Sequence, residues 1–432
     1  MNRPPVIALF PEASFGAALN CVGIARELAA RGAEPVFLCH PGFTGVFAEY
    51  GFREYHLQPD RDIGPEPARS EVYWQDFVNT HLTHFDQDPL TQLTTYVAPT
   101  WEAIVDTAIA VDQSLEQLLT QIQPDAILLD NVIMFPAILR SGKPWVRVVS
   151  CAETEIPDPL VPPYLSGLAT GDVAGRTAWE KASARALRAP HARYNAFRRS
   201  RGLKPLPAGQ FLESSDWLNL LLAPSAVRHP RAHPLPEDRF IFLEGCVREE
   251  GRFDPPPLPR DEGPLVYTSF GSLGAVDTGQ IGRMIEVFAT IPARFHVNVG
   301  GFMDEYGHVP DNVSLGSWFP QPSVVAKAAL FIHHGGNNSF CEALFHGVPS
   351  LVMPYCWDGH DNARRAEETG TGRRMHRSDW DAAGLRAMIT DLLADAPMRA
   401  RLNGISARMK QQPGVAQAAD GVLAMLRVPA AE

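Results

Sequence analysis

Residues 318–363 read WFPQPSVVAKAALFIHHGGNNSFCEALFHGVPSLVMPYCWDGHDNA and carry the densest pattern in the chain. In their middle, an apolar strand ending at His333 enters a glycine-rich turn, and the helix that follows runs to about His346, where Gly347 ends it. Glycines let a ligand approach the backbone, and the unpaired N–H groups at a helix start attract anions. This stretch therefore predicts a strand, a turn and a helix that bind a diphosphate.

Apolar strands and helices alternate on both sides of this stretch. Strands are expected at 6–10, 35–39, 126–129 and 145–150, and again at 265–270, 296–299, 330–333 and 350–353. Helices are expected between 16 and 32 and around 114–122. Strands that are apolar on both faces and alternate with helices indicate doubly wound parallel sheets. The predicted fold class is α/β, with two facing Rossmann-like domains, parallel sheets and a ligand-binding cleft between the domains.

The length of 432 residues fits two domains. Residues 255–259 read PPPLP within a proline-rich and charged region, which is typical of a linker. We therefore expect an N-terminal Rossmann-like domain at 1–226, an interdomain linker at 227–263 and a C-terminal domain at 264–410. A C-terminal helix at 411–432 is expected to pack back on the N-terminal domain.

Composition limits the classes of partner that this protein is expected to bind. The net charge is −11 and the basic residues form no stripe, which disfavours a nucleic-acid partner. The six cysteines are dispersed and show no metal-ligand spacing with histidine, as expected for reduced thiols. The first apolar run, 6–10, is too short for a signal or membrane segment, so we expect no membrane insertion and a cytoplasmic location.

Two side chains add chemistry to the diphosphate stretch. Glu342, one turn into the helix, can accept two hydrogen bonds from a vicinal diol such as a ribose, and Trp318 offers a flat face for a base. Taken alone, a glycine-rich turn is usually just a turn, Trp318 fits a core position and Asp358 fits a loop cap. The functional interpretation rests on their combination at fixed spacing.

This combination resembles the donor-binding signature of the family-1 glycosyltransferases, the UDP-glycosyltransferase superfamily, and most of all its bacterial natural-product and macrolide branch. The resemblance implies a GT-B fold with the acceptor on the N-terminal domain and the nucleotide-sugar donor on the C-terminal domain. It also implies a donor site made of Trp318 on the nucleobase, Gln321 on base or ribose, His334, Gly336, Asn338 and Ser339 around the diphosphate, Ser272 on a phosphate, Glu342 on the ribose hydroxyls and Asp358 on the sugar.

The sequence departs from this family at two positions. Gly359 follows Asp358 where the family commonly has a glutamine that holds the sugar, which leaves either a different sugar or His360 to make that contact. Near the N-terminus, Gly16 aligns with the family's glycine and Ala17 with the histidine that acts as general base. The usual base is absent.

Carboxylates are the first candidates to replace it. Asp130 ends a strand where the family has the aspartate that orients the histidine, and Glu12 follows the first strand at the cleft edge. A turn or capping role is the alternative for each. His81 and His84 are further candidates, although a surface position is the commoner one for histidines in a loop.

A metal or other cofactor is not expected. The strings Asp86-x-Asp88 and Asp379-x-Asp381 fit a metal-binding pattern in letters only, and Asp379-x-Asp381 is better interpreted as a helix cap. The helix terminus already supplies positive potential for the phosphates. Six aromatic residues within 73–101 are candidates for an apolar acceptor pocket, with core packing as the alternative: Tyr73, Trp74, Phe77, Phe85, Tyr96 and Trp101.

The sequence thus predicts an inverting glycosyltransferase that moves a sugar from a UDP- or TDP-linked donor to a small, partly hydrophobic acceptor, a natural product. Two alternatives remain open. One is a non-catalytic family member that binds the donor and serves as partner or regulator of another transferase, which the alanine at 17 favours. The other is a GT-B epimerase of nucleotide sugars, which the Trp-x-Pro-Gln start disfavours. No G-x-G-x-x-G follows the first strand, so an NAD-dependent oxidoreductase is a poor rival.

Overall fold

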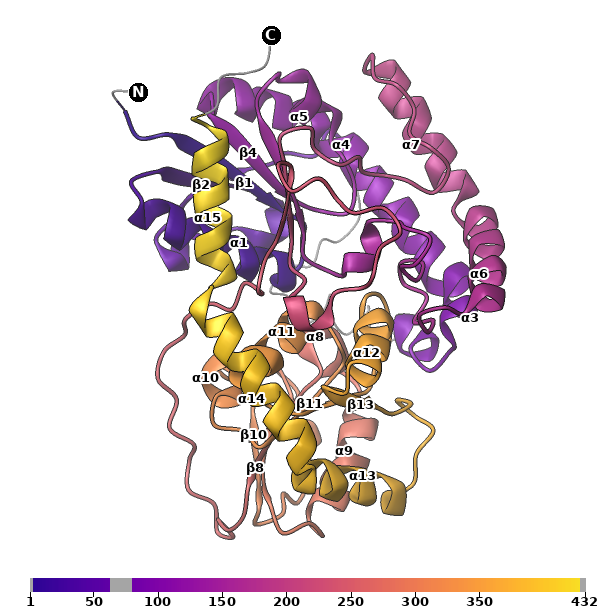
Figure 1. Ribbon diagram of the computed structural model, residues 1–432, viewed down its shortest axis with the longest axis vertical. Coiled ribbons are helices and arrows are strands. Elements are labelled where there is room, and N and C mark those ends of the chain that lie inside the picture. The colour runs from indigo at the N-terminus through magenta and orange to yellow at the C-terminus, as the bar shows by residue number, and fades with distance from the viewer. Residues whose placement is uncertain (1–2, 63–79, 428–432) are drawn as a thin grey trace.

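The computed structural model describes residues 3–62 and 80–427, and its N-terminal half is built on a seven-stranded sheet whose paired strands are all parallel (Figure 1). The strand order is β3-β2-β1-β4-β5-β6-β7. The strands are β1 (Val6–Pro11), β2 (Glu34–Cys39), β3 (Arg53–His56), β4 (Ala126–Asp130), β5 (Trp145–Val149), β6 (Leu218–Leu221) and β7 (Phe240–Phe242). The order reverses between β1 and β4, which makes the carboxyl ends of these two strands the switch point of the sheet.

Helices cover both faces of this sheet. They are α1 (Phe15–Ala30), α3 (Pro89–Gln92), α4 (Ala98–Ile122), α5 (Pro136–Arg140), α6 (Val173–Ala186) and α7 (Arg188–Ser200), with single turns η1 (Pro41–Phe43), η2 (Ala48–Tyr50), η3 (Leu82–His84), η4 (Leu93–Val97), η5 (Glu153–Glu155) and η6 (Ser225–Val227). Alternate residues of β1 point to opposite faces: Ile7 and Leu9 pack with α1, whereas Ala8 and Phe10 pack with α4. Burial on both faces explains why the strand reads as a continuous apolar run.

The C-terminal half repeats this plan with a six-stranded parallel sheet of order β10-β9-β8-β11-β12-β13. Its strands are β8 (Leu265–Ser269), β9 (Arg294–Asn298), β10 (Val313–Gly316), β11 (Leu330–His333), β12 (Ser350–Val352) and β13 (Gly372–Arg374). Its helices are α8 (Gly271–Gly274), α9 (Thr278–Phe288), η7 (Met303–Glu305), α10 (Gln321–Val325), α11 (Asn337–His346), α12 (Gly359–Glu368), α13 (Ala382–Ala394) and α14 (Ala396–Gln411). The switch point here lies between β8 and β11. Two parallel, doubly wound sheets confirm the predicted fold class.

The last helix, α15 (Gly414–Met425), returns to the N-terminal half. It runs beside α1 in Figure 1, where Arg31 and Asp420 form an ion pair of 2.7 Å. Its residues Ala418 and Val422 are buried in the same cluster as the core face of α1. The chain therefore crosses between the halves twice.

Two expectations needed correction. The region 227–263 is not free of strands, because β7 lies inside it. Its three apolar residues, FIF, pair with β6 and form an edge of the sheet. The helix expected around 114–122 begins much earlier, at Ala98, because Val105, Ala108 and Val111 extend its buried stripe.

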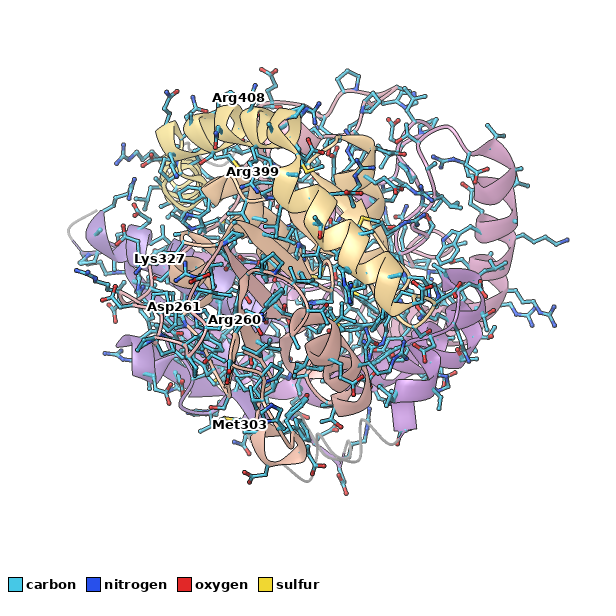
Figure 2. All side chains as sticks on the ribbon, turned by 90° about the horizontal axis from the view of Figure 1, so that it is seen from below. Arg260, Asp261, Met303, Lys327, Arg399 and Arg408 are labelled. Carbon is cyan, nitrogen blue, oxygen red and sulfur yellow. The ribbon has the colours of Figure 1, made fainter. Side chains whose placement is uncertain are left out.

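Charges on the surface of the C-terminal half are dispersed. Figure 2 shows Arg260, Lys327, Arg399 and Arg408 spread across this face, with Asp261 among them. No helix within the described residues is both long and apolar enough to cross a membrane.

Candidate active site

The start of α11 lies at the switch point of the C-terminal sheet. β11 ends at His333, and Gly335 then turns the chain with a φ of +94°. A Cβ at position 335 would lie 2.6 Å from the carbonyl oxygen of Gly359, so only glycine fits this turn. Gly336 occupies the N-cap position of α11, and no side chain of its own caps the helix. The predicted strand, turn and helix are confirmed, and Gly347 ends the helix in the left-handed region as expected.

His334 lies beside this turn. Its ring stacks on Tyr355 with 5.0 Å between ring centroids, and a Cβ added to Gly336 would lie 2.6 Å from its Nε2. Burial, and the charge of Arg377 to a smaller extent, lower the pKa of His334 to about 4. The imidazole is therefore neutral at physiological pH and offers a hydrogen bond without a charge. Ser272 lies in α8, the helix that follows β8, and its side chain falls outside the described part of the structure.

Glu342 is the centre of a buried hydrogen-bonded group. Its Oε2 accepts from Nε2 of Gln321 at 2.7 Å, and the same amide nitrogen lies 3.1 Å from the hydroxyl of Ser339. Its Oε1 lies 3.2 Å from Nη1 of Arg248, a residue of the linker region that also pairs with Glu250. Burial raises the pKa of Glu342, and the charge of Arg248 opposes that rise. The structure thus brings Gln321, Ser339 and Glu342 together as a unit.

Trp318 precedes Gln321 by three residues in the sequence. It lies in the loop between β10 and α10, and 66% of its surface is exposed. A large aromatic residue at this exposure is not a core residue, so the core alternative considered for Trp318 is excluded. Its ring is free to stack on a flat ligand.

Asp358 also lies at the start of α11. Its Oδ2 accepts hydrogen bonds from the backbone N–H of Asn337 at 3.0 Å and from Nδ2 of Asn362 at 3.1 Å. Burial raises its pKa well above the ordinary value, and the hydrogen bond from Asn337 opposes this. Trp357, directly before it, has a φ of +54°, a conformation that costs energy for a bulky residue and is common at functional sites.

Two expected donor-site residues turn toward the N-terminal half. Nδ2 of Asn338 donates to the carbonyl oxygen of Gly16 at 3.0 Å. Nε2 of His360 lies 3.0 Å from Oε1 of Gln92, and burial lowers the pKa of His360 to about 4. The structure therefore places these two side chains in the interface between the halves and not in the group around Glu342.

The switch point of the N-terminal sheet carries the two proposed bases. Asp130 is the last residue of β4 and Glu12 directly follows β1, and the backbone N–H of Glu12 donates to the carbonyl oxygen of Asp130 at 2.8 Å. Asp130 is only 2% exposed and accepts from the hydroxyl of Ser150 at 2.5 Å. Oε1 of Glu12, which is less buried, accepts from the hydroxyl of Ser14 at 2.8 Å. Burial raises the pKa of both carboxyl groups.

Glu155 is a third carboxylate that sequence reasoning missed. It lies in η5 after β5, and its carboxylate is 3.2 Å from Nη2 of Arg147. Burial raises the pKa of Glu155 to about 7, Arg147 opposes the rise, and the charge of Glu12 adds to it. One signal was visible in the sequence: an arginine inside the apolar strand WVRVV requires a buried acidic partner.

The other histidines and aromatics lie elsewhere. The rings of His81 and His84 are 5.8 Å apart, and His81 contacts Tyr96 edge-on. Phe85, Tyr96 and Trp101 are all buried in the core, which confirms the packing alternative for these three. Tyr73, Trp74 and Phe77 lie outside the described residues.

The Asp-x-Asp strings are helix caps at their second aspartates. Asp88 accepts from the backbone of Leu90 and Thr91 at the start of α3, and Asp381 accepts from the backbone of Gly384 at the start of α13. The capping interpretation of Asp381 is confirmed. Asp86, by contrast, lies 3.6 Å from the guanidinium of Arg377.

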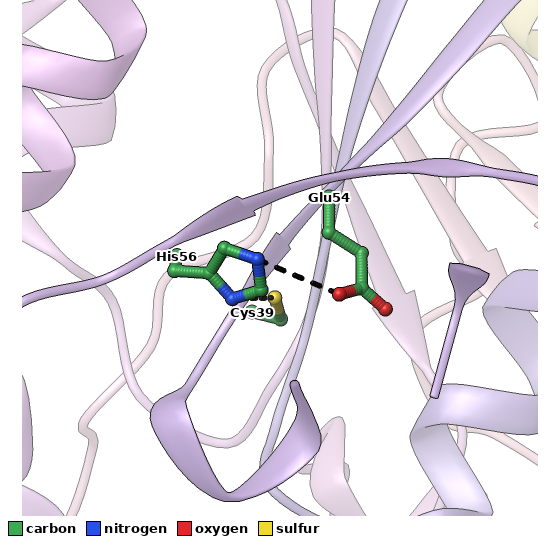
Figure 3. Close-up of side chains that lie close together, drawn as sticks. All are labelled: Cys39, Glu54 and His56. Carbon is green, nitrogen blue, oxygen red and sulfur yellow. Dashed lines mark hydrogen bonds and ion pairs between the residues drawn. The ribbon is translucent and has the colours of Figure 1, made fainter. Parts of the chain in front are cut away.

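One cluster in the described part of the chain has three side chains of metal-binding type: Cys39, Glu54 and His56 (Figure 3). Sγ of Cys39 lies 3.5 Å from Nδ1 of His56, whereas Glu54 lies 3.6 Å from Nε2. The two partners therefore approach opposite nitrogens of one ring. The Glu54 oxygens already accept from three backbone N–H groups, and burial raises the pKa of the Cys39 thiol to about 12. This geometry fits hydrogen bonding between Cys39 at the end of β2 and His56 at the end of β3 better than the binding of one metal ion.

Known proteins resemble this chain over its whole length. Residues 281–425 match the family model of the erythromycin biosynthesis protein CIII-like C-terminal domain. The oleandomycin glycosyltransferase of Streptomyces antibioticus is 25% identical over 432 residues, covering 98% of this chain and 92% of that protein. The calicheamicin glycosyltransferase CalG4 has a TM-score of 0.73 at 22% identity, and both chains are covered completely. The glycosyltransferase VinC, solved in complex with dTDP, has a TM-score of 0.68 at 18% identity, covering 98% of this chain and 99% of that one.

The two doubly wound parallel sheets form a GT-B fold, as in the solved glycosyltransferases. Similarity along the whole chain shows an enzyme of the glycosyltransferase class. The chain resembles bacterial family-1 glycosyltransferases of antibiotic biosynthesis.

Proposed function

We propose that this enzyme transfers a sugar from a nucleoside diphosphate donor to a hydroxyl of a natural-product acceptor with inversion at the anomeric carbon. The C-terminal half, 264–410, holds the donor, and the N-terminal half, 1–226, holds the acceptor. The observation that carries the proposal is the pairing of two switch points: the start of α11 beside His334 and Asp358, and the strand ends with Asp130 and Glu12. The dTDP bound to VinC supports a nucleotide donor for this fold.

The donor end of the reaction needs positive potential and a place for the nucleoside. The start of α11 supplies backbone N–H groups and the positive end of the helix dipole for the departing diphosphate. Neutral His334 adds a hydrogen bond, Glu342 receives ribose hydroxyls, and Trp318 stacks on the base. Because the helix start supplies this potential, we propose that no metal ion or other cofactor takes part.

The acceptor end needs a base in place of the histidine that Ala17 replaces. The acceptor hydroxyl loses its proton to a carboxylate while its oxygen attacks the anomeric carbon, and the bond from that carbon to the diphosphate oxygen breaks. Asp130 and Glu12 remain the two candidates. Burial raises the pKa of both carboxyl groups, which makes each a stronger proton acceptor than an ordinary carboxylate.

A donor screen with the purified enzyme tests this function. UDP- and dTDP-sugars are incubated with and without a panel of hydroxylated acceptors, and binding and nucleoside diphosphate release are both measured. Release that depends on an acceptor supports a transferase. Binding without release with every acceptor supports a non-catalytic partner, and a changed sugar in the absence of any acceptor supports an epimerase. The configuration of the product settles inversion.

A further inference from the structure

Residues 154–168, here named the acceptor loop, connect β5 to the region before α6 and carry Glu155 and Tyr164. The hydroxyl of Tyr164 is buried and has no hydrogen-bond partner within the described structure. Its ring meets that of Trp357 edge-on, at 6.4 Å between centroids. Burial raises the pKa of Tyr164, and the charges of Cys151, Glu155 and Asp358 add to the rise. The ring contact with Trp357, the residue directly before Asp358, places Tyr164 beside the C-terminal half.

A single carboxylate of the opposite half holds both ends of the acceptor loop. Asp361 on α12 is 7% exposed. Its Oδ2 accepts from the hydroxyl of Thr154 at 2.6 Å and from the backbone N–H of Leu165 at 2.8 Å, and its Oδ1 accepts from the backbone N–H of Gly167 at 2.8 Å. Thr154 begins the loop, and Leu165 and Gly167 lie near its end. These three hydrogen bonds to the carboxylate of Asp361 fix the conformation of the acceptor loop.

The loop also approaches α12 too closely for other side chains. Gly167 has a φ of +58°, and a Cβ at this position would lie 3.0 Å from Cβ of His360. Its carbonyl oxygen accepts from Nε of Arg364 at 3.2 Å. Because Asp358 directly precedes α12, the proposed donor-sugar position and the anchor of the acceptor loop belong to the same element.

We propose that Asp361 is a positioning residue of the transfer reaction: from the donor half it fixes the acceptor loop so that Tyr164 and Glu155 face the sugar position at Asp358, and it thereby sets acceptor binding. The inference rests on the proposed function. It assigns the hydroxyl of Tyr164 to a polar group of the substrate, because no protein group within the described residues meets it. Acceptor recognition in this enzyme then depends on a residue of the donor half.

The competing explanation is that Asp361 merely holds the two halves together. α12 offers a matched control for that role. Glu368, two turns further along, accepts from the backbone N–H of Thr170 at 2.7 Å and from its hydroxyl at 2.8 Å. This pair also joins the halves, but it lies beyond the acceptor loop. Glu368→Gln therefore weakens the interface without releasing the loop.

The experiment compares Asp361→Asn, Thr154→Val and Glu368→Gln in the full-length enzyme. Hydrogen exchange of peptides covering 160–168 reports the anchor directly and needs no turnover. Calorimetry with UDP and dTDP reports donor binding, and release of the nucleoside diphosphate with umbelliferone as probe acceptor reports kcat and acceptor KM. In Asp361→Asn, exchange of Leu165 and Gly167 is expected to accelerate and acceptor KM to rise about tenfold, with donor Kd within about twofold of the wild type.

Thr154→Val removes one of the three bonds and is expected to change exchange and acceptor KM in the same direction by less. Glu368→Gln is expected to leave both unchanged. Unaltered exchange at Leu165 and Gly167 in Asp361→Asn overturns the anchor, and equal changes in Glu368→Gln or a parallel loss of donor affinity reduce Asp361 to an interface contact. If Asp361→Asn does not fold, Thr154→Val decides by the same readouts. Absence of turnover in the wild type counts against the proposed function, while the exchange result still tests the anchor.

Discussion

The two switch points of this enzyme use the same architecture for opposite chemistry. At the C-terminal one, β11 leads into glycines, backbone N–H groups and a neutral His334, which suit an anion. At the N-terminal one, Glu12 follows β1 and Asp130 ends β4, and burial raises the pKa of both carboxyl groups, which suits them to accept a proton. A parallel sheet thus provides an edge where several strands end together. We propose that the residues placed there make one edge a phosphate site and the other a hydroxyl site.

The two sites also differ in how they are assembled. The donor side comes almost entirely from 318–363, a continuous stretch. The acceptor side combines residues that lie far apart in the sequence, Glu12, Asp130, Glu155 and Tyr164, and the donor half adds Asp361. Each of the following measurements tests whether this difference between an anion site and a carboxylate site is real.

The largest expected effect is a loss of folding stability with rising pH, caused by the ionisation of Glu155. Its pKa, about 7 in the folded enzyme against an ordinary 4.5, is raised chiefly by burial. The folded state therefore holds the proton more tightly than the unfolded chain, so the contribution to stability is full below the ordinary pKa and is lost as pH rises through about 7. The loss amounts to about 3 kcal/mol at most, at 1.36 kcal/mol per pKa unit.

Thermal melting at about pH 5 and about pH 8 measures this loss, with Glu155→Gln as the comparison. The wild type is expected to lose more stability across this range than the variant, which cannot ionise at position 155. Equal pH dependence of both proteins contradicts the assignment of a proton to Glu155 and weakens the description of the acceptor side as a carboxylate site.

The second effect concerns the base. Asp130→Asn is expected to lower kcat by about 10²-fold or more with donor affinity little changed, because the amide still accepts from Ser150 but takes no proton. If Glu12 is the base, Glu12→Gln gives that result instead. Rates with a weakly acidic alcohol and calorimetry with the donor separate the two steps. Near-normal kcat in both variants excludes both carboxylates and directs attention to His81 and His84.

The third effect tests the donor side. Glu342→Ala is expected to weaken nucleotide-sugar binding by about 2 kcal/mol, roughly 30-fold, the scale of lost charge-assisted hydrogen bonds. Glu250→Gln is the matched control, because it disturbs the other ion pair of Arg248 and leaves Glu342 in place. Calorimetry with UDP and dTDP gives both numbers. Unchanged affinity in Glu342→Ala rules out its ribose contact.

The donor side is easier to predict from sequence than the acceptor side, because its residues come from one continuous stretch. The strand, turn and helix around Gly335 were predicted from sequence because each step depends on neighbours within a few residues. β7 was missed because its pairing depends on the free edge of β6, which no local pattern reveals. Arg248 and Asp361 were missed for the same reason: their partners lie 94 residues away and in the opposite half. The roles of such residues depend on burial and on long-range hydrogen bonds, and neither can be predicted from sequence spacing.

The smallest effect, no effect at all, is expected from metal removal. Turnover is predicted to survive treatment with a chelator, because the start of α11 can neutralise the departing diphosphate with fixed dipoles that a chelator does not remove. Asp88 and Asp381 cap helices, and Glu54 accepts hydrogen bonds from backbone N–H groups. These three carboxylates are therefore not free to bind a cation beside the phosphates. The measurement is the rate of nucleoside diphosphate release before and after dialysis against the chelator. A loss of rate that magnesium or manganese restores contradicts the prediction. Such a result also shows that the donor side relies on a bound cation. The two sides then differ in the ligands they bind, and the contrast between backbone dipoles and carboxylates does not hold.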